Sequence, residues 1–376
     1  MQINEIIIYI MVVFMAVSAI DKCIGNKFGL GEKFEEGFMA MGSLTVAMVG
    51  VICLAPVLAN VLKPVVVPLY KALGADPSMF ATTLLACDMG GFPLATQLAE
   101  TKAAGLFAGA ILGSMMGPTI VFTIPVALGI IEKKDHKFLA TGVLAGIITI
   151  PIGCLIGGLV AGLGIGMILR NLVPIVIFAA LIAIGLWKIP EKMINGFNLF
   201  GKFVVILITI GLACGIIEKL TGLVIIPGMT PLDDGIKVVG DIAVVLAGAF
   251  PMVYVITKVF KKPLMRLGSL LGMNDVAAAG MVATLANNIP MFGMLKDMDD
   301  RGKLINVAFA VSAAFVFGDH LGFVAGVAKQ MIFPMIVGKL VGGVTAVMLA
   351  CVIASKSSIV SKNNEGKAPG SEAMNS

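Results

Sequence analysis

Apolar residues fill long, nearly unbroken stretches of this chain, and short polar segments separate them. Each stretch is close to the roughly 20 residues that a helix needs to cross a hydrocarbon core about 30 Å thick. The pattern predicts about ten or eleven transmembrane helices within a single transporter-like domain at residues 1–354, with a short interfacial helix at 64–75. The predicted stretches are residues 3–20, 38–62, 78–98, 104–131, 138–163, 168–187, 199–217, 236–260, 276–295, 304–328 and 331–354.

Composition supports an all-α polytopic membrane protein. The 376 residues are 59% hydrophobic and only 13% charged, whereas a soluble domain carries about a quarter charged residues. The net charge of +5 comes from lysines clustered between apolar stretches, as the positive-inside rule predicts for cytoplasmic loops. It therefore indicates no nucleic-acid partner. The six cysteines are scattered without metal-ligand spacing, so neither a disulfide framework nor a zinc site is expected.

The ends of the chain and its loops give the expected topology. Glu5 and no cation precede the first apolar stretch, which makes it a first transmembrane helix, since a cleaved signal has a basic start. The charged segments 132–137, 188–192 and 258–266 are two predicted spans apart and can share one side, expected to be cytoplasmic. Trp187 at a span end should lie at headgroup level. The polar tail at 355–376 is predicted to be disordered.

Three segment pairs recur in the same order and predict two repeat units, at about 36–165 and 235–354. The pairs are 62–76 with 261–274, 85–92 with 285–292, and 152–158 with 337–343. Small residues also recur every fourth position, a pattern that lets membrane helices approach closely. These stripes are Gly105, Gly109, Gly113 and Gly117, and, at a shift of 201, Asn306, Ala310, Ala314 and Gly318. An odd number of spans per unit would invert one repeat relative to the other.

The repeats point to four helix breaks, and repeat-built transporters bind substrate at such breaks near the midplane. The expected breaks lie at Gly90, Gly91 and Pro93 after Asp88, at Gly117 and Pro118, at Pro290 and Gly293 after two asparagines, and at Gly318. The side chains predicted to bind substrate there are Asp88, Phe92, Thr119, Asn287, Asn288, Phe292 and Asp319. His320 and Asp319 are the candidates for proton coupling, because histidine titrates near neutral pH.

An ionised carboxylate at the bilayer centre costs about 2.5–3.5 kcal/mol on insertion scales. Asp88 should therefore face a cavity, be paired or be protonated. Structural alternatives stay open: Asp88 near the interface or held by a lysine, Asp319 bonded to His320 to close a break, the asparagines as helix caps, and the two phenylalanines as packing. Carboxylates with hydrogen-bonding neighbours favour a small organic cation, and the lack of arginine at the breaks disfavours an anion.

Several long motifs resemble the ethanolamine permease family encoded in bacterial ethanolamine-utilisation operons, over nearly all of the chain up to about residue 350. They include "FEEGFMAMG" at 34–42, "LLACDMGGF" at 84–92, "IPEKMINGF" at 189–197, "AAAGMVATLANNIPMFGM" at 277–294 and "GDHLGF" at 318–323. The chain differs from the family pattern at Pro93, where a large apolar residue is expected, and in shorter loops after Gly162 and Gly228. The resemblance implies a multi-pass inner-membrane protein that admits ethanolamine for a cytoplasmic lyase pathway, often housed in a microcompartment, and it transfers no site residues.

Other functions remain as alternatives. Asp88 and Asp319 in different spans would suit an intramembrane aspartyl protease, but the flanking motifs of that class are absent, so no enzyme is expected. An uncoupled channel or facilitator, or a carrier of another amine such as choline, would also fit. Glu35 and Glu36 are either a cation-attracting vestibule or a solvated loop. No cofactor or metal is expected; the partners are the substrate and the lipid bilayer, and a homo-oligomer is left open.

Overall fold

The computed structural model describes residues 3–356, and this part of the chain is helical without a strand. Eight of its helical segments are long and apolar enough to cross a membrane. Seven of them are α1 (Ile3–Cys23), α2 (Leu30–Leu44) continuing through a π-helical turn into α3 (Gly50–Ala72), α9 (His136–Val160), α10 (Ile165–Lys188), α11 (Pro190–Thr221), α12 (Leu232–Leu270) and α17 (Ile332–Lys356). The all-α polytopic fold predicted from the sequence is confirmed.

The eighth segment, residues 102–130, is irregular, and three more apolar stretches are interrupted. The irregular segment contains α6 (Lys102–Leu106), α7 (Met116–Pro118) and α8 (Ile124–Ile130), joined by π- and 3₁₀-helical turns. The interrupted stretches are α4 (Ser78–Leu84) with α5 (Phe92–Leu98), α13 (Asp275–Ala286) with α14 (Asn288–Met294), and α15 (Asp300–Ala313) with α16 (Asp319–Val327). The eleven predicted stretches are therefore seven continuous segments, one irregular segment and three interrupted ones.

Two boundary predictions need correction. No separate interfacial helix forms at 64–75, because α3 continues to Ala72 through Pro64 and Pro68; helices in apolar surroundings tolerate the backbone groups that proline frees where neighbours satisfy them. α17 extends to Lys356, so Ser355 and Lys356 of the predicted tail are helical. Residues 357–376 lie outside the described residues.

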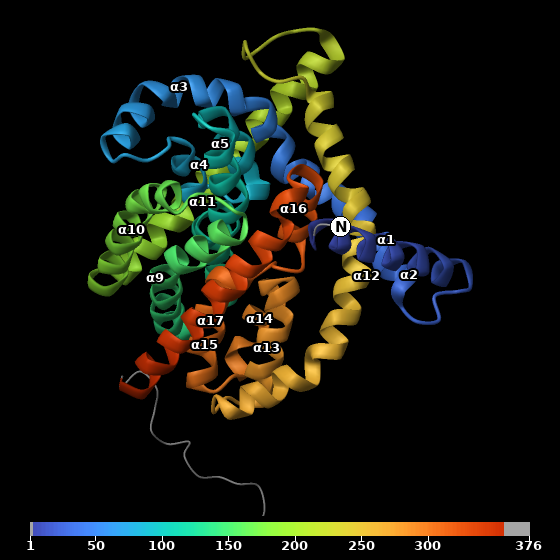
Figure 1. Cartoon of the computed structure of the whole chain (residues 1–376), viewed down its shortest axis with the longest axis vertical. Coiled ribbons are helices and arrows are strands. Elements are labelled where there is room, and N and C mark those ends of the chain that lie inside the picture. Colours follow the sequence, from blue (N-terminus) through green and yellow to red (C-terminus); the bar gives the residue numbers. More distant parts are fainter. Residues whose placement is uncertain (1–2, 357–376) are drawn as a thin grey trace, which may run out of the picture.

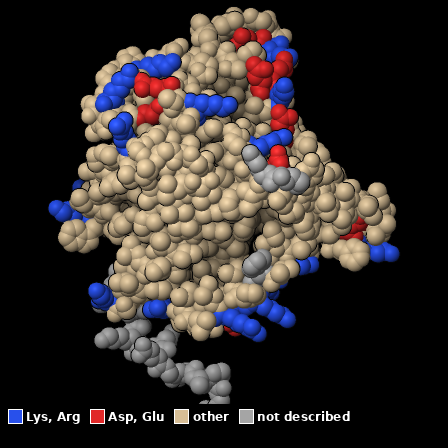
Figure 2. All heavy atoms as spheres, in the orientation of Figure 1, with Lys and Arg blue, Asp and Glu red and all other residues tan. Residues whose placement is uncertain are grey.

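The helices enclose the broken stretches (Figure 1). α12 runs along one side of the molecule, α9 and α10 lie on the other, and α15, α16 and α17 lie between them, while α1 and α2 project from the α12 side. Charged side chains gather toward the two ends and on the projecting α1–α2 part, and the broad band between is mostly uncharged (Figure 2). This distribution is the one expected for a protein whose middle faces hydrocarbon.

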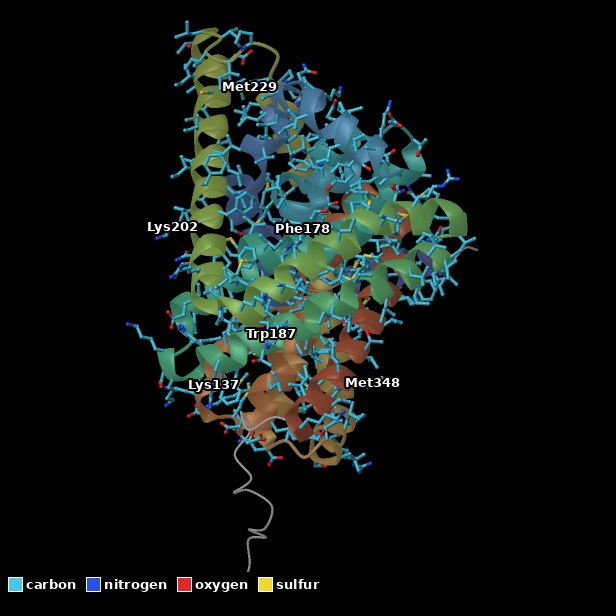
Figure 3. The ribbon with its side chains drawn as sticks, turned by 90° about the vertical axis from the view of Figure 1, so that its left-hand side faces the viewer. Lys137, Phe178, Trp187, Lys202, Met229 and Met348 are labelled. Carbon is cyan, nitrogen blue, oxygen red and sulfur yellow. The ribbon has the colours of Figure 1, made fainter. Side chains whose placement is uncertain are left out.

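The charged segments 132–137 and 188–192 line one pocket, and Asp135 and Leu271 both contact the start of α15. The predicted cytoplasmic placement of the three charged segments stays a prediction. Lys303 forms a 2.7 Å ion pair with Asp135, and Arg301 Nε donates a 2.5 Å hydrogen bond to the carbonyl of Leu271, just beyond α12. Lys137 and Trp187 line the same pocket and lie toward the same end (Figure 3). The exposed Trp187 side chain thus lies beside a charged loop, where an interfacial indole is expected.

The glycine stripe lets the irregular segment pack closely against the first broken helix. A Cβ added at Gly109 would lie 2.5 Å from the ring of Phe92, and one at Gly117 would lie 2.0 Å from the carbonyl oxygen of Leu85. In the second half, a Cβ at Gly318 would lie 2.1 Å from the carbonyl oxygen of Ala286. A close approach of a glycine to a backbone carbonyl thus occurs in both halves, at positions related by the predicted shift of 201. The repeat itself, and its orientation, stay predictions.

Candidate functional site

The first break lies on both sides of Asp88. Leu85 and Ala86 are extended after α4, and Gly90 has φ of 87°. A side chain at Gly90 would be strained there and would also meet Val51 at 1.9 Å. The expected break after Asp88 therefore begins three residues earlier, and Pro93 belongs to the first turn of α5, where proline is tolerated because its missing N–H is not needed.

The second break is at Asn287, which is extended (φ −156°, ψ 136°) and caps α14 by accepting a 2.8 Å hydrogen bond from the Ile289 amide. Pro290 lies in the first turn of α14 and Gly293 near its end, so neither interrupts the chain. Asn288 Nδ2 donates a 3.1 Å hydrogen bond to Thr123 Oγ1, and its buried Oδ1 has no protein partner. Asn287 therefore acts as a helix cap, which was one of the structural alternatives for the asparagines. Asn288 instead connects the second half of the chain to Thr123 in the first half.

The third break, residues 314–318, has strained backbone. Phe315 has φ of 63°, which is uncommon for a bulky residue. Its amide donates a 3.2 Å hydrogen bond to the Thr284 carbonyl, and the Phe317 amide donates a 2.9 Å bond to the Leu285 carbonyl. The predicted break at Gly318 thus begins at residue 314, and Asp319 and His320 form the first turn of α16. In the irregular segment, the backbone departs from helical geometry at Met115 (φ −125°, ψ −64°), two residues before Gly117 and Pro118.

The first break, the third break with the start of α16, and the irregular segment line a hollow of about 180 Å³, which we call the central hollow. Asp88 comes from the first break, and Asp319 and His320 come from the third. Phe122 and Phe315 supply aromatic rings whose centroids lie 5.6 Å apart in an edge-to-face arrangement. The remaining lining residues are Ser43, Leu44, Ala47, Ala86, Met89 and Pro118. Two carboxylates and no cation therefore line this hollow.

A chain of polar contacts leads from the central hollow into the protein. Asp88 Oδ1 lies 3.9 Å from His320 Nε2, and His320 Nδ1 lies 3.1 Å from Lys339 Nζ. Lys339 Nζ also donates a hydrogen bond to the carbonyl of Ser114. Lys339 is 1% exposed, so its charge is compensated within this cluster. A protonated lysine has only donors, and Nδ1 must then accept, which leaves the proton of a neutral His320 on Nε2, toward Asp88.

Lys339 is a member of this cluster that the sequence reasoning missed. It lies in the middle of the apolar stretch 331–354 and within the repeated motif "VGKLVGG". An ionisable residue inside a predicted span is a functional-site signal by itself, and that signal was available. Because Lys339 carries a cationic group near the breaks, the lack of arginine there disfavours an anionic substrate less strongly than the sequence suggested. However, Lys339 lies behind His320 and does not line the central hollow.

A second hollow of about 250 Å³, the outer hollow, shares Asp319 with the central one. Glu36, Lys33 and Asn287 also line it, and Glu36 is ion-paired with Lys33. Glu35 instead forms a 2.6 Å ion pair with Lys22 at the surface. Of the two glutamates considered as a vestibule, Glu36 therefore lines the outer hollow, whereas Glu35 lines neither the outer nor the central hollow.

Five of the seven predicted binding residues do not line the central hollow. Asn287 lines the outer hollow instead, and Asn288 is buried against Thr123. The hydroxyl of Thr119 is buried and hydrogen-bonded to the carbonyls of Met115 (2.8 Å) and Val311 (3.1 Å). Phe92 lines another hollow and packs edge-to-face on Phe323. Phe292 is 1% exposed within the hydrophobic core. The aromatic rings beside the carboxylates come from the breaks themselves and from the turn after Thr119, which repeat matching alone did not indicate.

Cys87, Asp88 and His320 also lie close enough to share a metal ion, with ligand atoms within 4.8 Å of one another. Lys339 contacts the second ring nitrogen of the same histidine. An ammonium group at that position repels a divalent metal ion about twice as strongly as a monovalent cation at the same distance. The cluster is thus better suited to proton exchange and to a monovalent organic cation.

Comparison with known proteins places the chain in a protein family. The model of the family described as "Ethanolamine utilisation protein, EutH" matches residues 3–353. The chain belongs to the EutH family. A relative from Listeria monocytogenes, named probable ethanolamine permease EutH, is 73% identical over 98% of both chains. The relative of that name from Escherichia coli is 56% identical over 98% of this chain and 100% of its own. The uncharacterised protein YxeR of Bacillus subtilis is 56% identical over 93% of this chain and 95% of its own.

No solved structure matches the chain. The family resemblance seen in the motifs is confirmed. Permease names class these relatives as transporters, and the eight segments able to cross a membrane agree with a multi-pass bacterial membrane protein. Two of the motifs that carried the resemblance, at 84–92 and 318–323, contribute Asp88, Asp319 and His320 to the central hollow.

Proposed function

We propose that this EutH-family protein admits protonated ethanolamine across the bacterial inner membrane for its catabolism, and that the central hollow is its binding site. The observation that carries the proposal is that Asp88 and Asp319, which come from opposite halves of the chain, line one small hollow that no cation lines. The names of the curated relatives support the substrate. A carboxylate held in a protein cavity lets a cation cross the membrane without exposure to hydrocarbon.

The size and lining of the hollow suit a small amino alcohol. A volume of about 180 Å³ holds roughly six water-sized groups and is below the usual range for drug-sized ligands. The ammonium group would lie between the carboxylates, beside the rings of Phe122 and Phe315. The hydroxyl of Ser43 donates to the Ala40 carbonyl, so its oxygen is left to accept a hydrogen bond from the substrate hydroxyl. A single aromatic pair is too few for a quaternary-ammonium cage.

Asp319 provides a route into the site because it lines both hollows. A cation attracted by Glu36 in the outer hollow would meet Asp319 next and then Asp88. The predicted vestibule role thus passes to Glu36 alone. Clefts lined by one sign of charge raise the local concentration of a counter-ion, although Lys33 partly offsets this effect through its ion pair with Glu36.

His320 is the proposed coupling residue, together with Asp319 and the newly found Lys339. With Lys339 protonated, His320 presents an N–H toward Asp88; a proton that moves from the lysine through the imidazole would reach the carboxylate and weaken its hold on the substrate ammonium. Protonation of Asp88 would thereby favour release. An uncoupled facilitator would use the same hollow without this step, and only transport data separate the two.

The decisive experiment is uptake of radiolabelled ethanolamine into proteoliposomes that contain the purified chain, with and without an imposed pH gradient or membrane potential. Asp88→Asn should abolish saturable uptake while folded protein remains in the membrane. Asp233→Asn, at an exposed carboxylate paired with Lys219, is the matched control and should transport normally. Full uptake by Asp88→Asn would refute the proposed ammonium partner.

Coupling is tested separately from substrate identity. Saturable uptake by the wild-type protein that a proton ionophore leaves unchanged would reject the coupled mechanism and favour the facilitator. His320→Gln should then be compared with the wild type across pH. We expect the variant to lose the pH dependence of uptake under a gradient while keeping downhill exchange; a wild-type pH profile would remove His320 from the coupling step.

A further inference from the structure

A hollow of about 400 Å³, which we call the third hollow, is lined by residues of α3, α5, α12 and α16. Its walls include the ring of Phe92, which packs on Phe323, and the carboxylate residue Asp241. It shares no lining residue with the outer or the central hollow. The proposed binding site therefore leaves this hollow without a role.

The helical segment that runs from α2 into α3 passes the three hollows in order. It lines the outer hollow with residues 33 and 36, the central hollow with residues 43, 44 and 47, and the third hollow with residues 52 and 55. Successive residues of a helix advance in one direction along its axis. The central hollow therefore lies between the other two along this segment.

Two further helices give the same order. α12 lines the outer hollow with residues between 250 and 257 and the third hollow with Asp241; Asp241 and Val253 are about 18 Å apart along the axis at 1.5 Å per residue. α16 lines the central hollow with Asp319 at its start and the third hollow with Phe323 one turn later. The three hollows are thus arranged in series.

A pair of aromatic rings lies where the central hollow gives way to the third. Phe92 follows Asp88 by four residues, and Phe323 follows Asp319 by four residues on α16, where that spacing places both side chains on one face. The carboxylates line the central hollow and the rings line the third. The ring centroids are 5.7 Å apart in an edge-to-face arrangement. Apolar constrictions of this kind exclude water and ions.

Each ring belongs to a half-helix that packs closely on a different neighbour. A Cβ added at Gly109 of the irregular segment would lie 2.5 Å from the Phe92 ring, and one at Gly322 of α16 would lie 2.1 Å from the Leu246 side chain of α12. Both half-helices follow a break in the chain, and short irregular segments can act as hinges. Movement of one half-helix at its break would separate the rings.

The charge of the third hollow matches that of the other two. Asp241 is its one charged lining residue, and no lysine or arginine lines it. Asp241 lies inside the span-length segment 232–259, and an ionisable residue within a span indicates a water-filled cavity or a path for a charged substrate. The carboxylate thus extends the acidic lining of the outer and central hollows.

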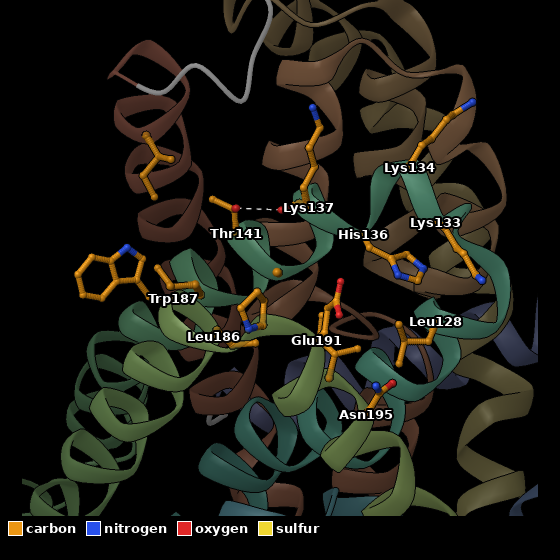
Figure 4. A pocket seen from close by; sticks show the side chains of 15 residues that line it. Leu128, Lys133, Lys134, His136, Lys137, Thr141, Leu186, Trp187, Glu191 and Asn195 are labelled. Atoms are coloured by element: carbon orange, nitrogen blue, oxygen red, sulfur yellow. Dashed lines mark hydrogen bonds between the residues drawn. The ribbon is translucent and has the colours of Figure 1, made fainter.

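Volume alone does not identify such a path. A larger hollow of about 1010 Å³ lies near Trp187 and is lined by lysines 133 and 134 as well as Glu191 (Figure 4). It shares no lining residue with the three hollows in series. Neither its charge nor its position connects it to the central hollow.

We propose that the third hollow is the second vestibule of the transport path, open to the side of the membrane opposite the outer hollow, and that Phe92 and Phe323 close it off from the central hollow. This inference rests on the proposed function, because it gives the central site its second opening. A small ammonium cation that leaves Asp88 passes between the parted rings, whose faces attract a cation, and reaches Asp241.

The first test is the side of the membrane from which each hollow is reached. Glu36→Cys and Asp241→Cys are treated with a membrane-impermeant cationic methanethiosulfonate in intact cells and in inverted membrane vesicles. Peptide mass spectrometry reads each position separately, so the native cysteines stay in place. Glu36→Cys should react in one preparation and Asp241→Cys in the other. Reaction of both from the same side would overturn the proposal.

The barrier is tested with Ala47→Cys, at a position that lines the central hollow. The reagent, added on the side that reaches Asp241, should modify this cysteine about tenfold faster when Phe323→Ala is added. That factor corresponds to about 1.4 kcal/mol, the upper part of what an edge-to-face pair contributes. Phe92→Ala, at a ring that is only partly buried, should act in the same direction.

The matched control for the barrier is Phe292→Ala, since Phe292 and Phe323 are both 1% exposed and Phe292 lines none of the three hollows. It should leave the rate of modification unchanged. An equal rise in the control, or no rise in either Phe323→Ala or Phe92→Ala, would reject the aromatic barrier.

Uptake of ethanolamine then tests whether the third hollow is on the path. Modified Asp241→Cys should lose uptake, whereas modified Lys237→Cys, exposed one turn earlier on α12 and outside the three hollows, should keep it. Equal uptake by the two would remove the vestibule from the path. Failure of the central site is distinguishable, because normal uptake by Asp88→Asn would reject the ammonium partner and leave the labelling pattern unchanged.

Discussion

Gly117→Ala tests whether the close approach at the first break positions the central hollow. The added methyl carbon would lie 2.0 Å from the Leu85 carbonyl oxygen, 1.4 Å short of ordinary van der Waals contact at 3.4 Å. The neighbour is backbone and cannot rotate away, so α4 must move. Overpacking of this kind typically costs about 1–3 kcal/mol, and this contact should reach the upper part of that range. Because Leu85 lies three residues before Asp88, the shift should also displace the carboxylate.

The assay combines thermal unfolding in detergent with ethanolamine uptake in proteoliposomes. Gly129→Ala is the control, since no atom lies within 4 Å of its added Cβ, and it should be neutral or gain up to about 1 kcal/mol from helix propensity. Gly117→Ala should unfold at a lower temperature than the wild type. It should also reduce the rate of uptake by about tenfold or more, because a displacement of about 1 Å at a reacting centre can reduce a rate to that extent. Equal stability and uptake in the two variants would refute the reasoning.

Three further predictions concern charge and ring contacts. Lys339→Met removes the donor to His320 and should change the pH dependence of uptake; the same pH profile as wild type would exclude the lysine from coupling. Asp135→Asn should destabilise the protein by about 3–5 kcal/mol because it leaves the buried Lys303 charge unpaired, and adding Lys303→Met should recover most of the loss in thermal unfolding; no recovery would contradict a pairwise cost. Phe122→Leu should raise the KM for ethanolamine about fivefold through a lost cation–π contact, whereas Phe92→Leu should not; the reverse order would return the site to Phe92.

The sequence predicted the architecture and the two carboxylates of the candidate site for physical reasons, but not the buried Lys339 behind them. The length of an apolar stretch is enough to distinguish a membrane span from a loop, and the eleven stretches were predicted on this basis. Only the continuity of the helix within some of them was predicted incorrectly. A buried carboxylate is costly enough to need a purpose, which identified Asp88 and Asp319 before any coordinates were known. His320 beside Asp319 also lies where expected, at the same hollow.

Side-chain direction at an irregular backbone could not be predicted in the same way. Thr119 was chosen for its place in a repeated break, but its hydroxyl bonds to backbone carbonyls across the helix interface. Phe315 enters the central hollow because its backbone adopts φ of 63°, a conformation that sequence patterns give no reason to expect for phenylalanine. Pro93 and Pro290 lie in the first turns of α5 and α14, and each break lies before its proline.

The backbone bonds at Phe315 and Phe317 have a consequence for how the protein is made. α13 has 12 residues and spans about 18 Å as a helix, too short to cross a hydrocarbon core alone. Its last carbonyls are satisfied by amides that the ribosome adds some thirty residues later, from Phe315 and Phe317. These backbone groups can therefore be satisfied only after both segments have been synthesised, and we expect the two half-helices to enter the bilayer together.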